Sequence, residues 1–380
     1  MSKNYINFHI LISHSPSCLN RDDMNMQKSA VFGGVRRVRI SSQSLKRAMR
    51  KSDYYAAEIG QASDRTRELG MIKTKYVEAL KERFSEQEVT QAIEWISGKD
   101  GLSDDTRADA VAPWAVEEVA YFCQVIADAG EDVDKKKLEK QIVKCAMPFH
   151  AALAHTTDIA LSGRMATSGL MTHVGVDGAL AVAHAITTHA VDADIDWFTA
   201  MDDLVSDGGE VGAGHLNTQE FSSGVFYRYA SLNLKQLQVN LGLLADMKSQ
   251  ETTDSRKAAL NIAKHVLHMM ATVVPSAKQQ SFAAHNLADY ALVSFSDFPV
   301  SLANAFEKPV SSKDGFLAAS IEMLNGYRNA VHRGYGLDEQ VGLFQLGSGG
   351  ECGECGDAEF FDSLVKLEAW IKTDAGVNEV

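Results

Sequence analysis

The chain has 380 residues, of which 45% are hydrophobic and 23% are charged. This balance is typical of a folded globular protein and argues against intrinsic disorder. No segment approaches the roughly 18 unbroken apolar residues that a membrane helix needs, and residues 1–14 lack the pattern of a signal peptide. The cysteine count is five, an odd number. We therefore expect reduced thiols and a cytoplasmic protein.

The net charge of −13 is distributed unevenly along the chain. Residues 21–51 carry nine basic and two acidic side chains, a net charge of +7, so the other residues together carry −20. A basic stripe on an acidic protein favours local phosphate binding, although such runs are more often plain solvated faces. The basic members are Arg21, Lys28, Arg36, Arg37, Arg39, Lys46, Arg47, Arg50 and Lys51.

The N-terminal part alternates between strand and helix patterns. Residues 5–13 alternate apolar and polar side chains, which predicts a half-buried strand. A polar loop follows up to residue 35, and residues 37–40 predict a second short strand. Ser41 or Ser42 can cap a helix over residues 43–51, with one apolar and one cationic face.

Residues 60–147 predict a block of helices inserted into a domain that contains strands. Ser85 begins a capping-box pattern, and Gly98 can end that helix. Pro113 suits the first turn of the next helix, which Gly130 can end. A lysine-rich helix is expected to start after Asp134.

The rest of the chain predicts more strands, one long protrusion and two further helices. Strands are expected in residues 159–169, 178–188, 224–232 and 291–295. Residues 192–223 form a polar excursion with a glycine-rich tip at residues 208–214, which predicts a long protruding hairpin or loop. Helices are expected at residues 258–274 and after the linker 347–356, and the whole pattern indicates an α+β fold.

The motifs for catalysis or metal binding are weak. Cys352 and Cys355 have metal-ligand spacing, but no second pair exists, so a flexible linker is the favoured interpretation. The pair Asp22 and Asp23 alone gives little support for a cation site. No nucleotide-binding, hydrolase or zinc-protease motif is present. The histidines in apolar contexts are expected to be core or boundary residues: His184, His189, His265 and His268.

Two segments offer the chemistry of phosphate recognition. Residues 39–47 combine cations, hydroxyl and amide donors, and a helix start. Residues 162–165 add a glycine, an arginine and a methionine that can pack against a base. Together they favour a track for single-stranded nucleic acid. The expected contacts are Arg21, Lys28, Arg39, Ser41, Ser42, Gln43, Lys46, Arg47, Arg50, Gly163, Arg164 and Met165.

Five segments resemble one protein family. Residues 14–28, 36–50, 162–169, 196–199 and 218–229 are similar to the CasC family, the backbone subunits of the type I-E CRISPR surveillance complex Cascade. The resemblance covers most of the chain, is weaker in the helical block and lapses after about residue 337. The glycine-rich tip and the Cys352/Cys355 segment depart from the family pattern.

The resemblance implies an RRM-like, ferredoxin-like palm with a helical fingers insertion and a β-hairpin thumb. It assigns the palm to residues 1–59, 158–191 and 224–346, the fingers to 60–157 and the thumb to 192–223. Residues 347–380 remain as a linker and C-terminal helix.

The implied function is a non-enzymatic scaffold. Copies would polymerise along a CRISPR guide RNA and present it in segments for pairing with complementary target DNA. The partners would be guide RNA, target DNA, further copies and the subunits CasA, CasB, CasD and CasE, with no membrane and no cofactor. The resemblance leaves one alternative, a metal-dependent ribonuclease that acts through Asp22 or Asp23.

The resemblance also guides two finer expectations. Phe198, Thr199 and Leu216 near the base of the hairpin would sit at a displaced guide nucleotide, while Trp197 is expected in the hairpin's own core. Repeated along a filament, a lysine stripe could hold duplex DNA, since stacking makes weak contacts multivalent. The stripe consists of Lys136, Lys140 and Lys144, and Lys137 beside it is expected to contact the same duplex.

Overall fold

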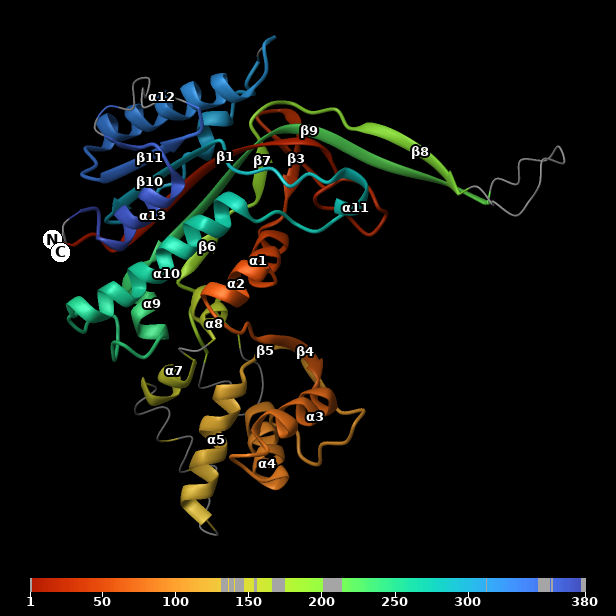
Figure 1. Cartoon of the computed structure of the whole chain (residues 1–380), viewed down its shortest axis with the longest axis vertical. Coiled ribbons are helices and arrows are strands. Elements are labelled where there is room, and N and C mark those ends of the chain that lie inside the picture. Colours follow the sequence, from red (N-terminus) through yellow and green to blue (C-terminus); the bar gives the residue numbers. More distant parts are fainter. Residues whose placement is uncertain are drawn as a thin grey trace.

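The structure is a computed structural model that describes residues 2–130, 136, 140, 147–153, 156–165, 175–200, 214–311, 313–347, 356 and 358–376. The α+β class expected from the sequence is confirmed. A large mixed sheet lies between helices, a helical lobe hangs from one end, and a two-stranded arm projects from the side (Figure 1). Among the described residues, no helix combines the length and apolar character that crossing a membrane requires.

The sheet is built around β1 (Tyr5–Ser17), which pairs antiparallel with β9 (Gly214–Asn233) and β10 (Tyr290–Ser296). In the described part of the chain, the strands run in the order β12-β11-β10-β1-β9-β7-β3-β2, and β6 and β8 also pair with β9. The other strands are β2 (Ser29–Phe32), β3 (Val35–Ile40), β6 (Leu180–Val182), β7 (Ala185–Thr187), β8 (Asp194–Ala200), β11 (Gln340–Gln345) and β12 (Glu359–Phe361).

The expectation that β1 is half-buried is wrong, because helices cover both faces of the sheet. Its apolar positions pack against α10 (Thr253–Thr272) and α13 (Leu364–Lys372), while Leu11 faces the core under α12 (Leu317–Tyr335). The polar positions on that second face are buried with partners. Asn7 Oδ1 accepts from Tyr229 Oη at 3.0 Å, and His9 Nδ1 lies 2.8 Å from Tyr227 Oη. The polar side chains that alternate with apolar ones along β1 therefore belong to a buried hydrogen-bond network and do not face solvent.

The smaller helices connect the sheet to its surroundings. They are α1 (Ser42–Arg50), α2 (Asp53–Glu58), α7 (Met147–Leu153), α8 (Thr157–Ser162), α9 (Leu234–Asn240), α11 (Gln279–Phe282) and the 3₁₀ helix η3 (Ala303–Phe306). The strand expected in residues 159–169 is wrong over residues 159–162, since these residues form the end of α8. A short apolar run fits a buried helix as well as a strand, and this one is buried throughout.

The helical lobe contains α3 (Leu69–Leu80), α4 (Glu86–Ser97) and α5 (Val116–Ala129), packed around a core of their own. The Ser85 capping box and the left-handed Gly98 at the end of α4 are confirmed, as is Gly130 at the end of α5. The all-helical expectation is wrong here, because β4 (Asp64–Glu68) and β5 (Arg107–Trp114) form a second sheet. Pro113 lies in β5 rather than in the first turn of α5.

The protruding hairpin expected from the sequence is confirmed. The C-terminal half of β9 runs beside β1, and its N-terminal half leaves the sheet and pairs with β8, from Asp194 opposite Phe221 to Thr199 opposite Leu216. One continuous strand thus forms part of the sheet and one side of the arm (Figure 1). The glycine-rich tip, the region after Asp134 and the Cys352/Cys355 segment lie outside the described residues.

Two buried histidines make the stability of this fold depend on pH. Burial, then the charge of Arg328, lowers the pKa of His9 to about 3, and burial, then Arg228, lowers that of His14 to about 3. His14 Nε2 lies 3.3 Å from Arg228 Nη2. The other terminal nitrogen of Arg228, Nη1, donates to the carbonyls of Met270 and Val273 at the end of α10. Neutral imidazole can accept from this guanidinium, whereas protonated imidazole cannot.

We expect the folded protein to lose stability as the pH falls from 7 to 5. Between about pH 3 and 6.5 these histidines are protonated in the unfolded chain and neutral in the folded protein. Their contribution to the free energy of unfolding is therefore complete above this window and is lost as the pH falls through it. At pH 5 each histidine should lower the free energy of unfolding by about 2 kcal/mol, measured by denaturant titration. His14→Gln should flatten the slope. A free energy of unfolding that stays constant over this range would contradict the assignment.

Candidate nucleic-acid interface

The N-terminus of α1 is held by protein partners. Ser41 is the cap, and its Oγ accepts from the backbone N–H of Ser44 at 3.3 Å. The N–H of Ser41 donates to Asn20 Oδ1 at 2.8 Å, and that of Ser42 donates to His184 Nδ1 at 3.1 Å. These amides are therefore already engaged, and any phosphate recognition by α1 rests mainly on its side chains.

The two faces of α1 expected from the sequence are confirmed, but the cations fall into two groups. Leu45 and Met49 are buried against the sheet. Arg47 and Lys51 are exposed, whereas Lys46 and Arg50 are partly buried. The cationic face thus has an exposed edge and a second edge that lies against neighbouring elements.

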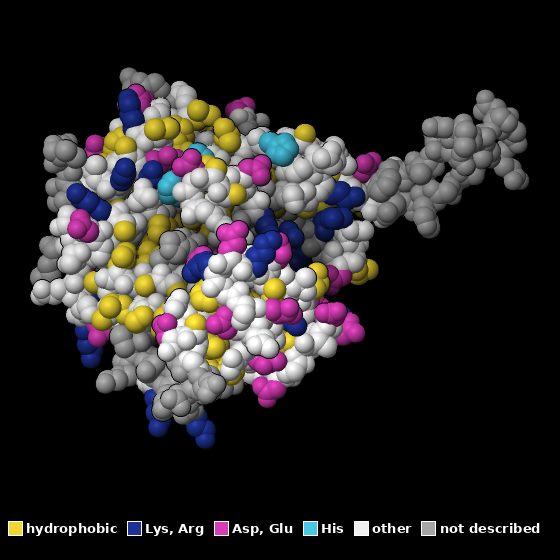
Figure 2. All heavy atoms as spheres, turned by 60° about the horizontal axis from the view of Figure 1, so that its bottom comes forward, with side chains coloured by type: hydrophobic (Ala, Val, Ile, Leu, Met, Phe, Trp, Pro, Cys, Tyr) yellow, Lys and Arg dark blue, Asp and Glu magenta, His cyan; other side chains and the backbone are white. Residues whose placement is uncertain are grey.

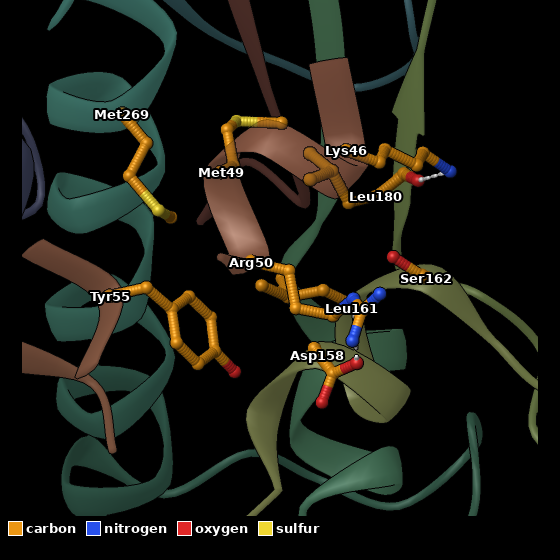
Figure 3. A pocket seen from close by; sticks show the side chains of 9 residues that line it. All are labelled: Lys46, Met49, Arg50, Tyr55, Asp158, Leu161, Ser162, Leu180 and Met269. Carbon is orange, nitrogen blue, oxygen red and sulfur yellow. Dashed lines mark hydrogen bonds and ion pairs between the residues drawn. The ribbon is translucent and has the colours of Figure 1, made fainter. Parts of the chain in front are cut away.

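A small cavity brings the two sequence motifs together. Lys46 of the first motif lines it with Ser162 of the second, and so do Arg50, Tyr55, Asp158 and Leu180 (Figure 3). Its volume is about 20 Å³, which has room for one water molecule and no nucleobase. Lys46 Nζ donates to the Leu180 carbonyl at 3.4 Å, and burial, then the charge of Arg65, lowers the pKa of Lys46.

Asp158 of α8 is the carboxylate at this cavity. Its Oδ1 accepts from the N–H of Ser63 at 2.8 Å, and its Oδ2 accepts from Ser63 Oγ at 2.6 Å. Arg50 Nε and Arg65 Nη2 lie 3.8 Å and 3.6 Å from Oδ2. Arg50 also donates to the Ser63 carbonyl at 2.9 Å. The structure thus adds Arg65 to the cationic group, which no sequence pattern had singled out.

The loop after β1 brings a second cationic group to the other end of α1. Lys28 and Arg39 lie on adjacent backbone, and the Arg39 N–H donates to the Lys28 carbonyl at 2.9 Å. Arg39 Nη1 lies 3.4 Å from His184 Nδ1, and burial, then Arg39 and Lys28, lowers the pKa of that histidine. Arg21 donates to Asn25 Oδ1 at 2.7 Å in the turn of the same loop.

The expectation that His184 is a core or boundary residue is wrong, since it is exposed between β6 and β7 at the start of α1. The sequence predicts strand over residues 178–188, whereas the structure has two short strands there, and His184 lies between them.

Two of the arginines that the sequence counts as cations are buried and structural. Arg37 is fully buried and donates to the carbonyls of Thr187 and Phe306. Arg164, expected to contact RNA, has a fully buried side chain, and its Nη1 lies 2.6 Å from Glu118 Oε2 of α5. Arg164 is therefore removed from the expected RNA contacts, because its charge is satisfied inside the protein.

The glycine and methionine beside Arg164 differ in their surroundings. Gly163 ends α8 with a φ of +75°, and a Cβ there would lie 2.7 Å from the backbone of Val176 and Gly178. A glycine is thus required here because the backbone of Val176 and Gly178 passes too close to position 163 for any side chain. Met165 is 91% exposed and remains available to a ligand.

The arm residues expected at a displaced nucleotide lie on paired strands. Phe198 and Thr199 are in β8, and Leu216 lies opposite Thr199 in β9, but their side chains are outside what the structure describes. Trp197 was expected in the core of the hairpin and is instead 62% exposed, with Ile195 exposed beside it on the same face. The arm thus presents apolar side chains to its surroundings.

The structure describes only part of the other two expected sites, the aspartate pair and the lysine stripe. Asp22 Oδ1 accepts from the N–H groups of Met24 and Met26 at 2.9 Å, so this carboxylate shapes its own turn. Asp22 and Asp23 are exposed, and among the described residues no group of three or more acidic, histidine or cysteine side chains could hold a metal. Lys136 and Lys140 are exposed, while Lys137 and Lys144 are outside the described residues. The lysine stripe and the ribonuclease stay predictions.

The charges on the surface separate by region. Acidic side chains spread over the helical lobe that faces the viewer in Figure 2, and Lys and Arg side chains lie along its boundary with the rest of the molecule. The cationic group around α1 belongs to the junction between sheet and lobe, where α1, β4 and α8 meet. This distribution suits the binding of a polyanion at the junction.

The comparisons with known proteins point to one family. The family described as CT1975-like protein matches residues 6–370. A chain of a solved "CRISPR RNA-guided surveillance complex, pre-nicking" is 27% identical with a TM-score of 0.77, over 98% of this chain and 100% of that one. A chain of a "CRISPR RNA-guided surveillance complex" is 22% identical with a TM-score of 0.56, over 96% and 98%. The search of curated proteins found no match. The resemblance to a surveillance-complex subunit is thus confirmed, and its type I-E assignment stays a prediction.

Replacing Arg164 should lower the stability of the fold, whereas RNA binding should not change because other cations contact the RNA. Arg164→Ala leaves Glu118 buried without its ion-pair partner and should lower the free energy of unfolding by about 3–5 kcal/mol. Arg164→Met combined with Glu118→Leu removes both charges and should recover much of that loss. A double-mutant cycle with the single variants Arg164→Met and Glu118→Leu would measure the coupling between the two residues. A variant Arg164→Ala with unchanged stability and weakened RNA binding would restore Arg164 to the interface.

Proposed function

The chain belongs to the CT1975-like protein family, and from this membership we propose that it is a scaffold subunit of a CRISPR RNA-guided surveillance complex. The observation that carries the proposal is the structural match with a TM-score of 0.77 over 98% of this chain and 100% of the other. Such a match covers the sheet, the helical lobe and the arm together, and it is accompanied by 27% identity.

In this proposal the protein binds guide RNA and performs no chemistry. The sheet with its helices corresponds to an RRM-like palm, α3–α5 with their small sheet to the fingers, and the β8–β9 arm to the thumb. Copies stack along one guide and present it in segments to complementary target DNA, beside the other subunits of a type I-E Cascade. The cations at both ends of α1 support this role, since phosphates along a strand need cations in succession.

Guide retention should depend on two cations of α1, the partly buried Lys46 and the exposed Arg47. Lys46→Ala with Arg47→Ala should weaken retention of every guide sequence alike and reduce the salt slope by about 0.7 for each lost phosphate contact. The matched control is Lys81→Ala with Arg83→Ala, which removes the same two charges from exposed positions on the helical lobe. Retention is measured by filter binding over a salt series. Equal losses in both double variants would mean that general charge, and not α1, holds the guide.

The arm should impose a regular interruption on the bound guide. If each arm displaces one nucleotide, chemical probing of RNA in the assembly should show reactive positions at a constant interval, because unstacked bases are accessible. Joining Asp196 to Gln219, which lie opposite each other, through a short turn would remove the outer arm. The periodic signal should then disappear while RNA stays bound. Uniform reactivity in the intact assembly would contradict this role.

A further inference from the structure

Cations from two parts of the fold converge at Asp158. Arg50 comes from α1, and Arg65 comes from β4 at the root of the helical lobe. Arg50 Nε and Arg65 Nη2 lie 3.8 Å and 3.6 Å from the same oxygen, Asp158 Oδ2. Figure 3 shows Arg50 and Asp158 pointing toward each other from α1 and α8. One carboxylate therefore lies beside two guanidinium groups, and Lys46 lines the same cavity.

This group carries more positive charge than its carboxylate balances. Asp158 is also the acceptor for two hydrogen bonds from Ser63, so its charge is shared. After burial, the charge of Arg65 is the next cause that lowers the pKa of both Lys46 and Arg50. Like charges held this close repel one another, and a bound anion would relieve that repulsion.

The anion must lie at the surface of the group. The cavity behind it has a volume of about 20 Å³, too small for a phosphate with its hydration. Arg65 retains 37% exposure of its side chain, whereas Arg50 retains 10%. The exposed guanidinium is the one free to turn outward, and its fork matches phosphate oxygens.

We propose that Arg65 is a further phosphate-binding residue for the single-stranded RNA held along α1, and that Asp158 is the positioning residue that keeps Arg65 beside α1. This inference rests on the proposed function. The helical lobe then contributes directly to RNA binding through Arg65. Asp158 together with Ser63 sets the spacing between α1 and the lobe.

The direct test compares two arginines on one strand. Arg65→Ala should raise the dissociation constant for a mixed-sequence single-stranded RNA several-fold and reduce the salt slope by about 0.7. Arg65→Lys should restore only part of the affinity, because lysine keeps the charge but lacks the guanidinium fork. Arg67→Ala is the matched control, since Arg67 is exposed on the same face of β4 two residues further along and lies 3.7 Å from Glu68.

The outcomes separate this inference from the proposed function. If Arg65→Ala binds like wild type while Lys46→Ala with Arg47→Ala binds weakly, the inference is wrong and the proposed function stands. If all these variants bind like wild type, the proposed RNA track itself fails. Equal weakening by Arg65→Ala and Arg67→Ala would show a general charge effect and would also overturn the inference.

A second measurement tests Asp158 through the melting temperature of the protein. Asp158→Asn keeps an acceptor for the Ser63 N–H but removes the charge that balances the cations. The free variant should melt at a lower temperature than wild type, and the same RNA should raise its melting temperature by less than it raises that of wild type, because Arg65 is no longer held beside α1. An equal or larger rise would mean that Asp158 does not position Arg65 for the RNA.

Discussion

The position of the candidate interface depends on one carboxylate. Asp158 lies in α8, which is far in sequence from α1 and from β4, yet its two oxygens hold Ser63 and lie near Arg50 and Arg65. Because Asp158 is almost fully buried, its charge would be costly without these partners. The same contacts that satisfy it place α1 and the root of the helical lobe side by side. A structural requirement of the interior thus produces an excess of positive charge at the surface.

A second constraint links the sheet to the arm. β9 pairs with β1 through its C-terminal half and with β8 through its N-terminal half, so no flexible joint separates arm from sheet. The loop after β1 is tied to the same strand, since the Gln27 N–H donates to Glu220 Oε2 at 3.0 Å and Ser222 Oγ donates to Gln27 Oε1 at 2.8 Å. The cations of that loop therefore keep a fixed relation to the base of the arm.

Local patterns in the sequence predicted what local physics determines. The cap of α1, the capping box of α4 and the hairpin of β8 and β9 each depend on residues close together in the chain, and all three are present. The failures involve distant partners. Arg164 looked like a surface cation because Glu118 lies 46 positions away, and the polar face of β1 looked solvated because its tyrosine partners are on β9. Arg65 escaped notice for the same reason, since only the fold brings it to α1.

We propose that RNA runs along α1 between the loop after β1 and the root of the helical lobe. A cryo-electron microscopy structure of the assembly purified with its bound RNA would test this path. Successive phosphates are expected within contact distance of Lys28, the exposed edge of α1 and Arg65. RNA that leaves this junction empty and follows another surface would contradict it.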